Sequence, residues 1–265
     1  MLHVHAFDAY RPGSSPVHRL DARVKLVVAV AFIAATVLLP DGAWPAFILQ
    51  EALALGVIVL SQLGVGFVLR RAAVALPFAL AAVTVAFSTP GDALAVAAVG
   101  PLTLTLTDSG VVRLVSIMLK AWMGVQAAIL LAASTPFPAL LQGMRGVGLP
   151  RVLVAIIGFT YRYLFVIADE ALRLLRARTA RSGTLGRRAG GSVLWRARVT
   201  GAMAGSLFLR SLERSERVYD AMVARGYDGE VRMLEAPRLR PAALVSGVCA
   251  LGLLALIQAL ARVAW

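Results

Sequence analysis

Long runs of apolar residues divide the chain into segments of membrane-spanning length. About 20 apolar residues cross a bilayer as a helix, and roughly 17 to 25 is the usual range. We predict transmembrane helices at residues 24–39, 44–63, 72–87, 111–133 and 241–261. The first run stops at Pro40-Asp41-Gly42, a typical turn sequence. The pattern therefore predicts an all-α polytopic membrane protein with about five transmembrane helices.

A different pattern separates the third run from the fourth. Leu102, Leu104 and Leu106 alternate with threonines. A period of two is typical of a β-strand. We expect a short extended segment there and assign it no function.

Two long helices of mixed character are predicted between the fourth and fifth runs. Residues 151–182 contain no proline and one internal glycine, Gly158, and they change from apolar and aromatic to charged along their length. We place this helix outside the bilayer. A sixth span is the alternative, and it would put Arg162 in the membrane at a cost of several kcal/mol unless the charge were paired. After a glycine-rich break at residues 183–192, a second helix is predicted from about residue 193 to residue 224.

Composition supports a membrane protein and charge gives it an orientation. Hydrophobic residues make up 59% of the chain and charged residues 15%, whereas about a quarter of a soluble domain is charged. Lys and Arg favour the cytoplasmic ends of membrane segments. Such residues stand at the entry to the first run and between the second and third runs, namely Arg19, Arg23, Lys25, Arg70 and Arg71. The amino terminus and the second loop are therefore expected in the cytoplasm.

The excess positive charge is concentrated in one part of the chain. The net charge is +13, and residues 141–240 hold 18 Arg against 8 Asp and Glu, a net of +10. We infer an N-terminal transmembrane region of four spans (1–133), an inserted cytoplasmic module (134–240) and a C-terminal transmembrane helix (241–265). Clustered arginines also contact nucleic acid, but cytoplasmic topology already accounts for them. We therefore expect no nucleic-acid partner.

Several chemistries are excluded by residue type. A P-loop needs Gly-Lys-Ser/Thr, whereas Lys25 precedes Leu26 and Lys120 precedes Ala121, so the chain cannot hydrolyse ATP with that loop. The single cysteine, Cys249, excludes an intrachain disulfide and a Cys-based zinc site. We find no compact group of carboxylates, histidines and a nucleophile, and we assign no catalytic residue.

Two further pairs of residues are of types that form sites. His3 and His5 are of a type that binds cobalt and nickel, but two histidines near a chain end are more often incidental, so we assign no metal site. Arg113 and Lys120 lie seven residues apart in the fourth run, near one helix face. For these we expect contact with an acidic residue of another span or with a partner.

Both helices of the inserted module end in a small residue, an arginine and a small residue. Glycine past a helix closes it in the left-handed conformation, and a cation suits the last turn, so helix capping alone could explain this ending. The repetition favours a second interpretation: two exposed guanidinium groups with small neighbours could enter grooves on a partner and bind carboxylates in bidentate fashion. The two triplets are Ala180-Arg181-Ser182 and Ala224-Arg225-Gly226.

Other motifs agree with these triplets along nearly the whole chain. They are SPVHRLDARVK (15–25), Ser134-Thr135-Pro136, Leu149-Pro150-Arg151, TYRYLF (160–165), GSLFLRS (205–211) and RVYDAM (217–222). Together they resemble the transmembrane (T) component of energy-coupling factor transporters, and in particular the CbiQ type of cobalt and nickel uptake systems.

The resemblance implies a function. In that family two Ala-Arg-Gly-like triplets bind a pair of ATPases, which here implies ATPase-binding residues Ala180, Arg181, Ser182, Ala224, Arg225 and Gly226. Ser182 stands where glycine is commonest, and we expect it to reduce clearance without loss of function. The chain would be a non-catalytic subunit of the inner membrane that links ATP hydrolysis to uptake. It would bind no cofactor; ATP and Mg would be bound by the ATPases, and Co or Ni would be the transported ion.

The resemblance also implies partners and leaves alternatives. The partners would be two ATP-binding-cassette ATPases, a substrate-specific (S) membrane subunit of the CbiM type, with or without a small accessory membrane subunit, and membrane lipid. A T component serving another substrate such as a vitamin is the first alternative. A conventional ABC permease subunit and a membrane enzyme acting on lipids are the others.

Overall fold

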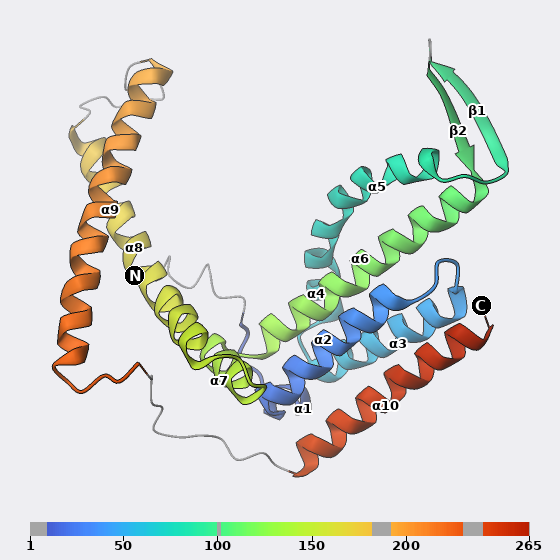
Figure 1. The fold of residues 1–265 in the computed structure, drawn as a ribbon, viewed down its shortest axis with the longest axis horizontal. Helices are drawn as coiled ribbons and strands as arrows, with labels where there is room; N and C mark the ends of the chain where they lie inside the picture. Colours follow the sequence, from blue (N-terminus) through green and yellow to red (C-terminus); the bar gives the residue numbers. More distant parts are fainter. Residues whose placement is uncertain (1–9, 100–101, 182–191, 230–240, 265) are drawn as a thin grey trace. The chain divides into compact units, whose positions relative to one another are not determined.

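The computed structural model describes residues 10–99, 102–181, 192–229 and 241–264. The chain divides into two compact units (Figure 1). One unit comprises Leu149–Glu235, and the other comprises Leu2–Gly148 with Ala236–Trp265. His3, His5 and Ser182 lie outside the described residues, as does most of the glycine-rich break.

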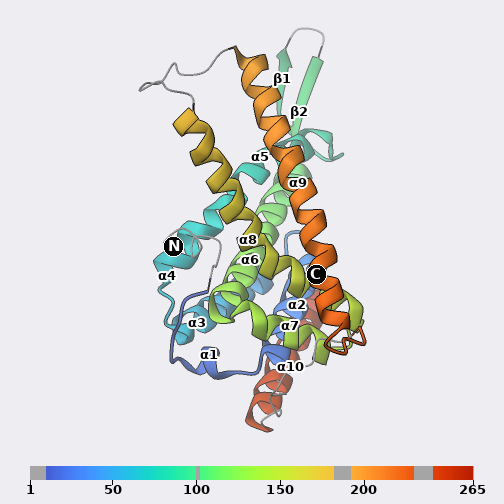
Figure 2. The ribbon, with the colours of Figure 1, turned by 90° about the vertical axis from the view of Figure 1, so that its left-hand side faces the viewer.

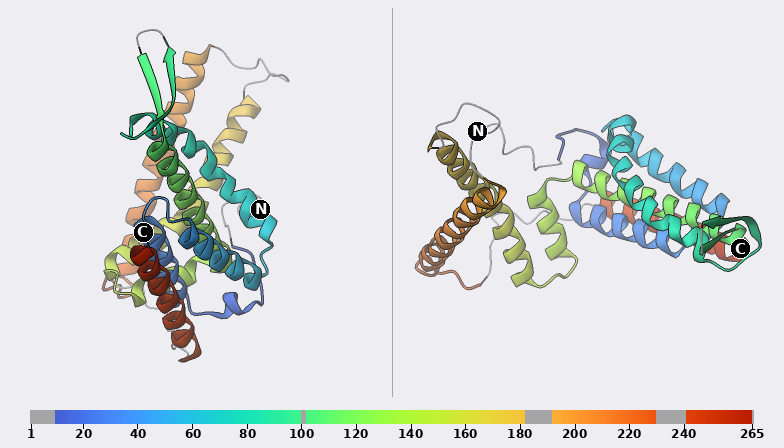
Figure 3. Two further views of the ribbon diagram at one scale, coloured as in Figure 1. Left: turned by 90° about the vertical axis from the view of Figure 1, so that its right-hand side faces the viewer. Right: turned by 90° about the horizontal axis from the view of Figure 1, so that it is seen from above.

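The larger unit is a helical bundle. Helices α2, α3, α6 and α10 run side by side in Figures 1 and 3, with α2 packed against α6, α7 and α10 and with α4 and α5 packed against α6. The helices are α1 (Pro16–Arg19), α2 (Ala22–Leu38), α3 (Trp44–Ser61), α4 (Val65–Ala72), α5 (Leu76–Ser88), α6 (Asp108–Ser134), α7 (Phe137–Gly146) and α10 (Pro241–Ala264). The bundle confirms an all-α membrane architecture.

Four of the five predicted apolar runs form unbroken helices: α2, α3, α6 and α10. The third run, 72–87, is interrupted, because a 3₁₀ turn at Ala73–Ala75 separates α4 from α5. Pro77 lies in the first turn of α5, where its missing N–H is tolerated, whereas inside a longer helix it would remove a hydrogen bond. One continuous span was therefore the wrong expectation for this run.

The described helices that are long and apolar enough to cross a membrane are Trp44–Ser61, Asp108–Ser134, Arg151–Arg181 and Pro241–Val263. Helix α2 has 17 residues and α5 has 13. At about 1.5 Å per residue, α5 is roughly 20 Å long. The helix Arg151–Arg181 also meets this test, so length and apolarity alone do not separate it from the spans.

A hairpin interrupts the helical pattern between α5 and α6. Strand β1 (Ala93–Val99) pairs antiparallel with β2 (Leu102–Thr107), and Val96 lies opposite Thr105. The alternation of leucine and threonine therefore did indicate a strand. Thr107 ends the hairpin and begins α6, since its Oγ1 accepts from the Gly110 N–H at 3.2 Å and donates to the Thr89 carbonyl at 2.8 Å.

Polar side chains join the helices inside the bundle. Gln50 of α3 is fully buried and donates from Nε2 to Thr36 Oγ1 of α2 at 2.7 Å. Gln126 of α6 donates to Glu51 Oε1 of α3 at 2.8 Å. These bonds explain why polar residues interrupt the second apolar run: they join α3 to the helices on either side.

The smaller unit contains a helix pair, α8 (Arg151–Arg181) and α9 (Val193–Val223). Both predicted helices are confirmed, with ends that agree closely with the expectation. Ser192 caps α9, because its Oγ accepts from the Trp195 N–H at 3.3 Å. Helix α7, which the sequence placed with the inserted module, packs against α2 in the larger unit. A Cβ added at Gly143 of α7 would lie 3.1 Å from the backbone of Ala22.

Candidate functional site

Helices α8 and α9 contact each other and run in opposite directions (Figure 2). Arg210 donates to Glu170 Oε1 at 3.0 Å, and Arg178 donates to Thr200 Oγ1 at 3.3 Å. Residue numbers on α9 fall as those of their contact partners on α8 rise, so the pair is antiparallel. The carboxyl ends of the two helices, and with them the two arginine triplets, therefore lie at opposite ends of the pair.

The separation of the two triplets follows from this register. Arg181 lies 11 residues beyond Glu170 on α8, and Arg225 lies 15 residues beyond Arg210 in the opposite direction. These 26 residues, at about 1.5 Å each, place the tips on the order of 40 Å apart along the pair. A single small ligand cannot contact both tips, whereas one large partner or two separate partners can.

The first tip is an exposed end of α8. Ala180 and Arg181 are both exposed in its last turn. Within the described residues no carboxylate lies within ion-pairing distance of Arg181. Arg178, one turn earlier, instead faces α9, with its guanidinium carbon 6.0 Å from the centre of the Trp195 ring. The helix thus places one arginine against its neighbour and leaves the other exposed at its end.

The second tip is a Schellman closure. Gly226 has φ +82°, its N–H donates to the Val223 carbonyl at 2.9 Å, and the Tyr227 N–H donates to the Met222 carbonyl at 3.0 Å. This is the left-handed glycine cap that the sequence predicted. Arg225 is exposed between the cap and the last turn. The capping interpretation is therefore confirmed for this triplet, and it leaves the guanidinium group available.

A groove of about 410 Å³ lies between the two helices beside the second tip. Met222 and Tyr227, whose backbones close the helix, both line it. An apolar contact between these two positions commonly accompanies a Schellman closure. The α8 side of the groove is formed by Phe159, Thr160, Tyr163 and Ile167. The second tip is thus joined to the body of the helix pair by apolar packing as well as by backbone bonds.

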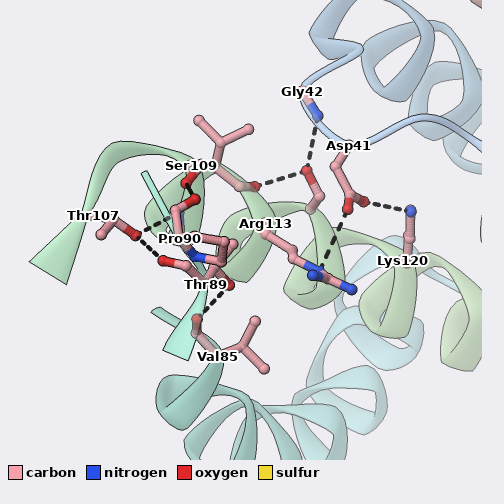
Figure 4. A network of polar contacts seen from close by, with 12 residues as sticks. Asp41, Gly42, Val85, Thr89, Pro90, Thr107, Ser109, Arg113 and Lys120 are labelled. Atoms are coloured by element: carbon pink, nitrogen blue, oxygen red, sulfur yellow. Dashed lines mark hydrogen bonds and ion pairs between the residues drawn. The ribbon is translucent and has the colours of Figure 1, made fainter. Parts of the chain in front are cut away.

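Arg113 and Lys120 in α6 both bind one acid (Figure 4). Lys120 Nζ lies 2.7 Å from Asp41 Oδ1, and Arg113 Nε lies 3.8 Å from Asp41 Oδ2. Nearby, the Gly42 N–H donates to Ser116 Oγ at 3.1 Å. The predicted acidic contact is confirmed, but the acid lies in the α2–α3 connection instead of inside a span. The cluster ties that connection to α6.

Sequence reasoning missed the role of Lys25. The residue is 8% exposed, and its Nζ donates to the carbonyls of His18 at 3.2 Å and Ser134 at 3.1 Å and to Thr135 Oγ1 at 3.1 Å. These three bonds join α1, α2 and the end of α6. The signal was a lysine, one of only two in the chain, at the start of an apolar helix.

Comparison with known proteins identifies the family. A family described as "Cobalt transport protein", CbiQ, matches residues 13–235. This chain belongs to the CbiQ family. The cobalt transport protein CbiQ of Rhodobacter capsulatus is 32% identical over 181 residues, which are 68% of this chain and 69% of that protein. The energy-coupling factor transporter transmembrane protein EcfT of Thermosediminibacter oceani is 26% identical over 264 residues, 97% of each chain.

A third relative is named as a fusion protein. The putative fused cobalt transport protein CbiMQ of Methanocorpusculum labreanum is 24% identical over 133 residues, which are 49% of this chain and 21% of that protein. Together with the CbiQ and EcfT relatives, it shows that the chain is a CbiQ-type T component of an energy-coupling factor transporter. It is an integral membrane protein that works with other subunits.

Proposed function

We propose that this CbiQ-type T component links ATP hydrolysis by two partner ATPases to the uptake of cobalt or nickel through a substrate-binding membrane subunit. The observation that supports the coupling role is the position of Arg181 and Arg225, exposed at opposite ends of one antiparallel helix pair. Each tip would bind one ATPase. Two ATP-binding-cassette subunits change their separation when they bind and hydrolyse ATP, and the helix pair would transmit that change to the membrane bundle.

The chemistry of each tip suits docking into a groove. A guanidinium group binds a carboxylate through two parallel hydrogen bonds, which fix orientation as well as position. The methyl side chains of Ala180 and Ala224 are too small to keep the helix ends from a partner surface. A Cβ added at Gly226 would meet no atom within 4 Å. Ser182 completes the first triplet by sequence.

The family supports the proposed cargo and remaining partners. The CbiQ name supports cobalt or nickel as the transported ion, and the fused CbiMQ relative supports an S subunit of the CbiM type. ATP and Mg would be bound by the ATPases, and this chain would hold no cofactor and catalyse no reaction. The inner membrane is the proposed location, with the amino terminus and the α8–α9 pair in the cytoplasm.

The decisive experiment is co-purification of the chain with its ATPases. Arg181→Ala and Arg225→Ala should each weaken the complex, and the double variant should lose ATPase binding and uptake while staying in the membrane. Arg198→Ala removes an exposed arginine of α9 that is not at a tip and serves as the matched control. Normal ATPase binding and uptake by the double variant would refute the proposal.

A T component that serves another substrate, such as a vitamin, is the second candidate, because the EcfT relative, aligned over 97% of this chain, has a name that specifies no metal. Uptake of radioactive cobalt or nickel by cells expressing the complete transporter separates the two. Metal uptake that depends on Arg181 and Arg225 supports the first candidate. Vitamin uptake with the same dependence, in the absence of metal uptake, supports the second.

A further inference from the structure

Two arginines that are distant in the sequence share one aromatic ring. The guanidinium carbon of Arg11 lies 3.6 Å from the centre of the Phe67 ring, and that of Arg71 lies 4.7 Å from the same point. Arg11 precedes α1, whereas Phe67 and Arg71 belong to α4. Both arginines are exposed. Two like charges are therefore held no farther apart than these two distances together.

Hydrogen bonds to both the N–H and the carbonyl of Arg11 hold its backbone in place. Its N–H donates to the Ala133 carbonyl at the end of α6 at 2.9 Å, and its carbonyl accepts from His18 Nε2 at 3.1 Å. The other nitrogen of that imidazole, Nδ1, lies 2.6 Å from Ser15 Oγ. The ring also packs so closely on Gly13 that an added Cβ would lie 2.7 Å from it. The position of Arg11 is thus built into the fold.

The charges of this cluster have no acidic partner among the described residues. No carboxylate there lies within ion-pairing distance of Arg11, Arg71 or the neighbouring Arg70, which is also exposed. Stacking of a guanidinium group on an aromatic ring uses the flat face of the cation. The N–H groups at its edge stay free to donate. The cluster is therefore a set of hydrogen-bond donors with no anionic partner among the residues that the structure describes.

The cluster lies at one end of the apolar bundle. Phe67 packs against a buried group formed by Ile58, Leu63, Val68 and Ala133, at the ends of α3 and α6. Helix α4 is amphipathic, since Val68 and Ala72 are fully buried while its arginines face outward. Such helices lie in the interface of a membrane, with basic residues near the headgroups. Val74, just beyond the arginines, is 65% exposed and offers apolar surface for an acyl chain.

We propose that Arg11, Arg71 and Phe67 form a binding site for the phosphate group of an anionic membrane phospholipid. Guanidinium groups bind phosphate oxygens through paired, charge-assisted hydrogen bonds, and basic pockets at the ends of membrane helices bind lipid headgroups. The phosphate would neutralise the two like charges and would join the segment before α1 to α4. The bundle end would then depend on lipid for its full stability.

The test measures lipid retention by the purified chain. Protein in detergent is mixed with phosphatidylglycerol or phosphatidylcholine, and bound lipid is counted by native mass spectrometry while melting is followed by circular dichroism. The wild type should retain phosphatidylglycerol and melt at a higher temperature with it. The double variant Arg11→Gln, Arg71→Gln should bind it at least tenfold more weakly. The double variant Arg196→Gln, Arg198→Gln loses the same charge from α9 and should behave as the wild type.

Further arms separate the possible anions and guard against misfolding. Inorganic phosphate alone should give neither binding nor a melting shift, and an effect equal to that of phosphatidylglycerol would assign a soluble anion and overturn the proposal. Equal lipid retention by the Arg11/Arg71 variant and the α9 control would also overturn it. If the double variant does not fold, the single change Arg71→Gln, which touches no backbone hydrogen bond of Arg11, is expected to weaken phosphatidylglycerol binding on its own.

Discussion

Arg210 of α9 donates a hydrogen bond to Glu170 of α8 across 3.0 Å, near the middle of both helices. Glu170 also lies 3.8 Å from Arg173 in its own helix. This acid therefore holds one arginine on each helix. It joins the two helices near their midpoints, in an antiparallel pair whose arginine tips point in opposite directions.

Replacing Arg210 with alanine should loosen the helix pair without removing either tip. Exposed ion pairs contribute up to about 1 kcal/mol, so the change in unfolding free energy should stay below that value. We expect the ATPases still to bind, but the metal taken up per ATP hydrolysed should fall, because a looser pair transmits movement less well. Parallel measurement of uptake and ATP hydrolysis in vesicles checks this. An unchanged ratio would show that the ion pair has no part in coupling.

Gly226→Ala should destabilise the end of α9. The left-handed φ of +82° costs an L-residue roughly 1 to 2 kcal/mol, although a Cβ there would meet no atom within 4 Å. Gly201→Ala is the matched control, because Gly201 lies inside α9 with the same open surroundings, and alanine there should stabilise the helix by about 0.5 to 1 kcal/mol. Thermal melts of the two variants should shift in opposite directions.

Lys25→Met should be among the more damaging single changes in the bundle. The substitution removes all three bonds from Nζ and leaves the carbonyls of His18 and Ser134 without this donor. Hydrogen bonds from a charged donor contribute roughly 1.5 to 3 kcal/mol each, so we expect a loss of at least about 2 kcal/mol. Reversible unfolding in mixed micelles measures it. Lys25→Arg, which keeps the charge, should recover part of the loss, and a melt like that of the wild type for Lys25→Met would contradict the assignment.

Asp41→Asn should leave two cations of α6 facing each other without an acid. Arg113 and Lys120 both bind Asp41, but all three side chains are partly exposed, so the loss should be at most about 1 kcal/mol. Added salt should reduce the difference from the wild type, because dissolved ions screen the interaction between exposed charges, with a screening length of about 10 Å at 0.1 M. Melting curves at low and high salt test this prediction. A difference that grows with salt would mean that the cluster acts through packing.

The sequence predicted the parts of the fold that depend on local pattern. Apolar runs of membrane length gave the positions of α2, α3, α6 and α10, and Gly226 marked the end of α9 because a left-handed cap needs a residue without a side chain. The second triplet was visible for the same reason, and the first because it repeats the order of a small residue, an arginine and a small residue. Their role in ATPase binding stays a prediction.

Relations between distant segments could not be predicted in this way. No periodicity indicates that Glu170 faces Arg210, so the opposite directions of the tips appeared only in the fold. Lys25 was interpreted only as a signal of membrane topology, because the sequence does not show that its partners lie on α1 and at the end of α6. The break before α5 was missed because the apolar run continues through Pro77 while the backbone changes its hydrogen bonding.

The antiparallel pairing of α8 and α9 also bears on symmetry. Each helix has 31 residues, and their contact at Glu170 and Arg210 lies near both midpoints. A half-turn about an axis through that contact brings one helix approximately onto the other and exchanges the two arginine tips. Two-fold symmetry is the commonest arrangement of paired subunits. A single, asymmetric chain can therefore offer the same feature twice to a symmetric pair of partners.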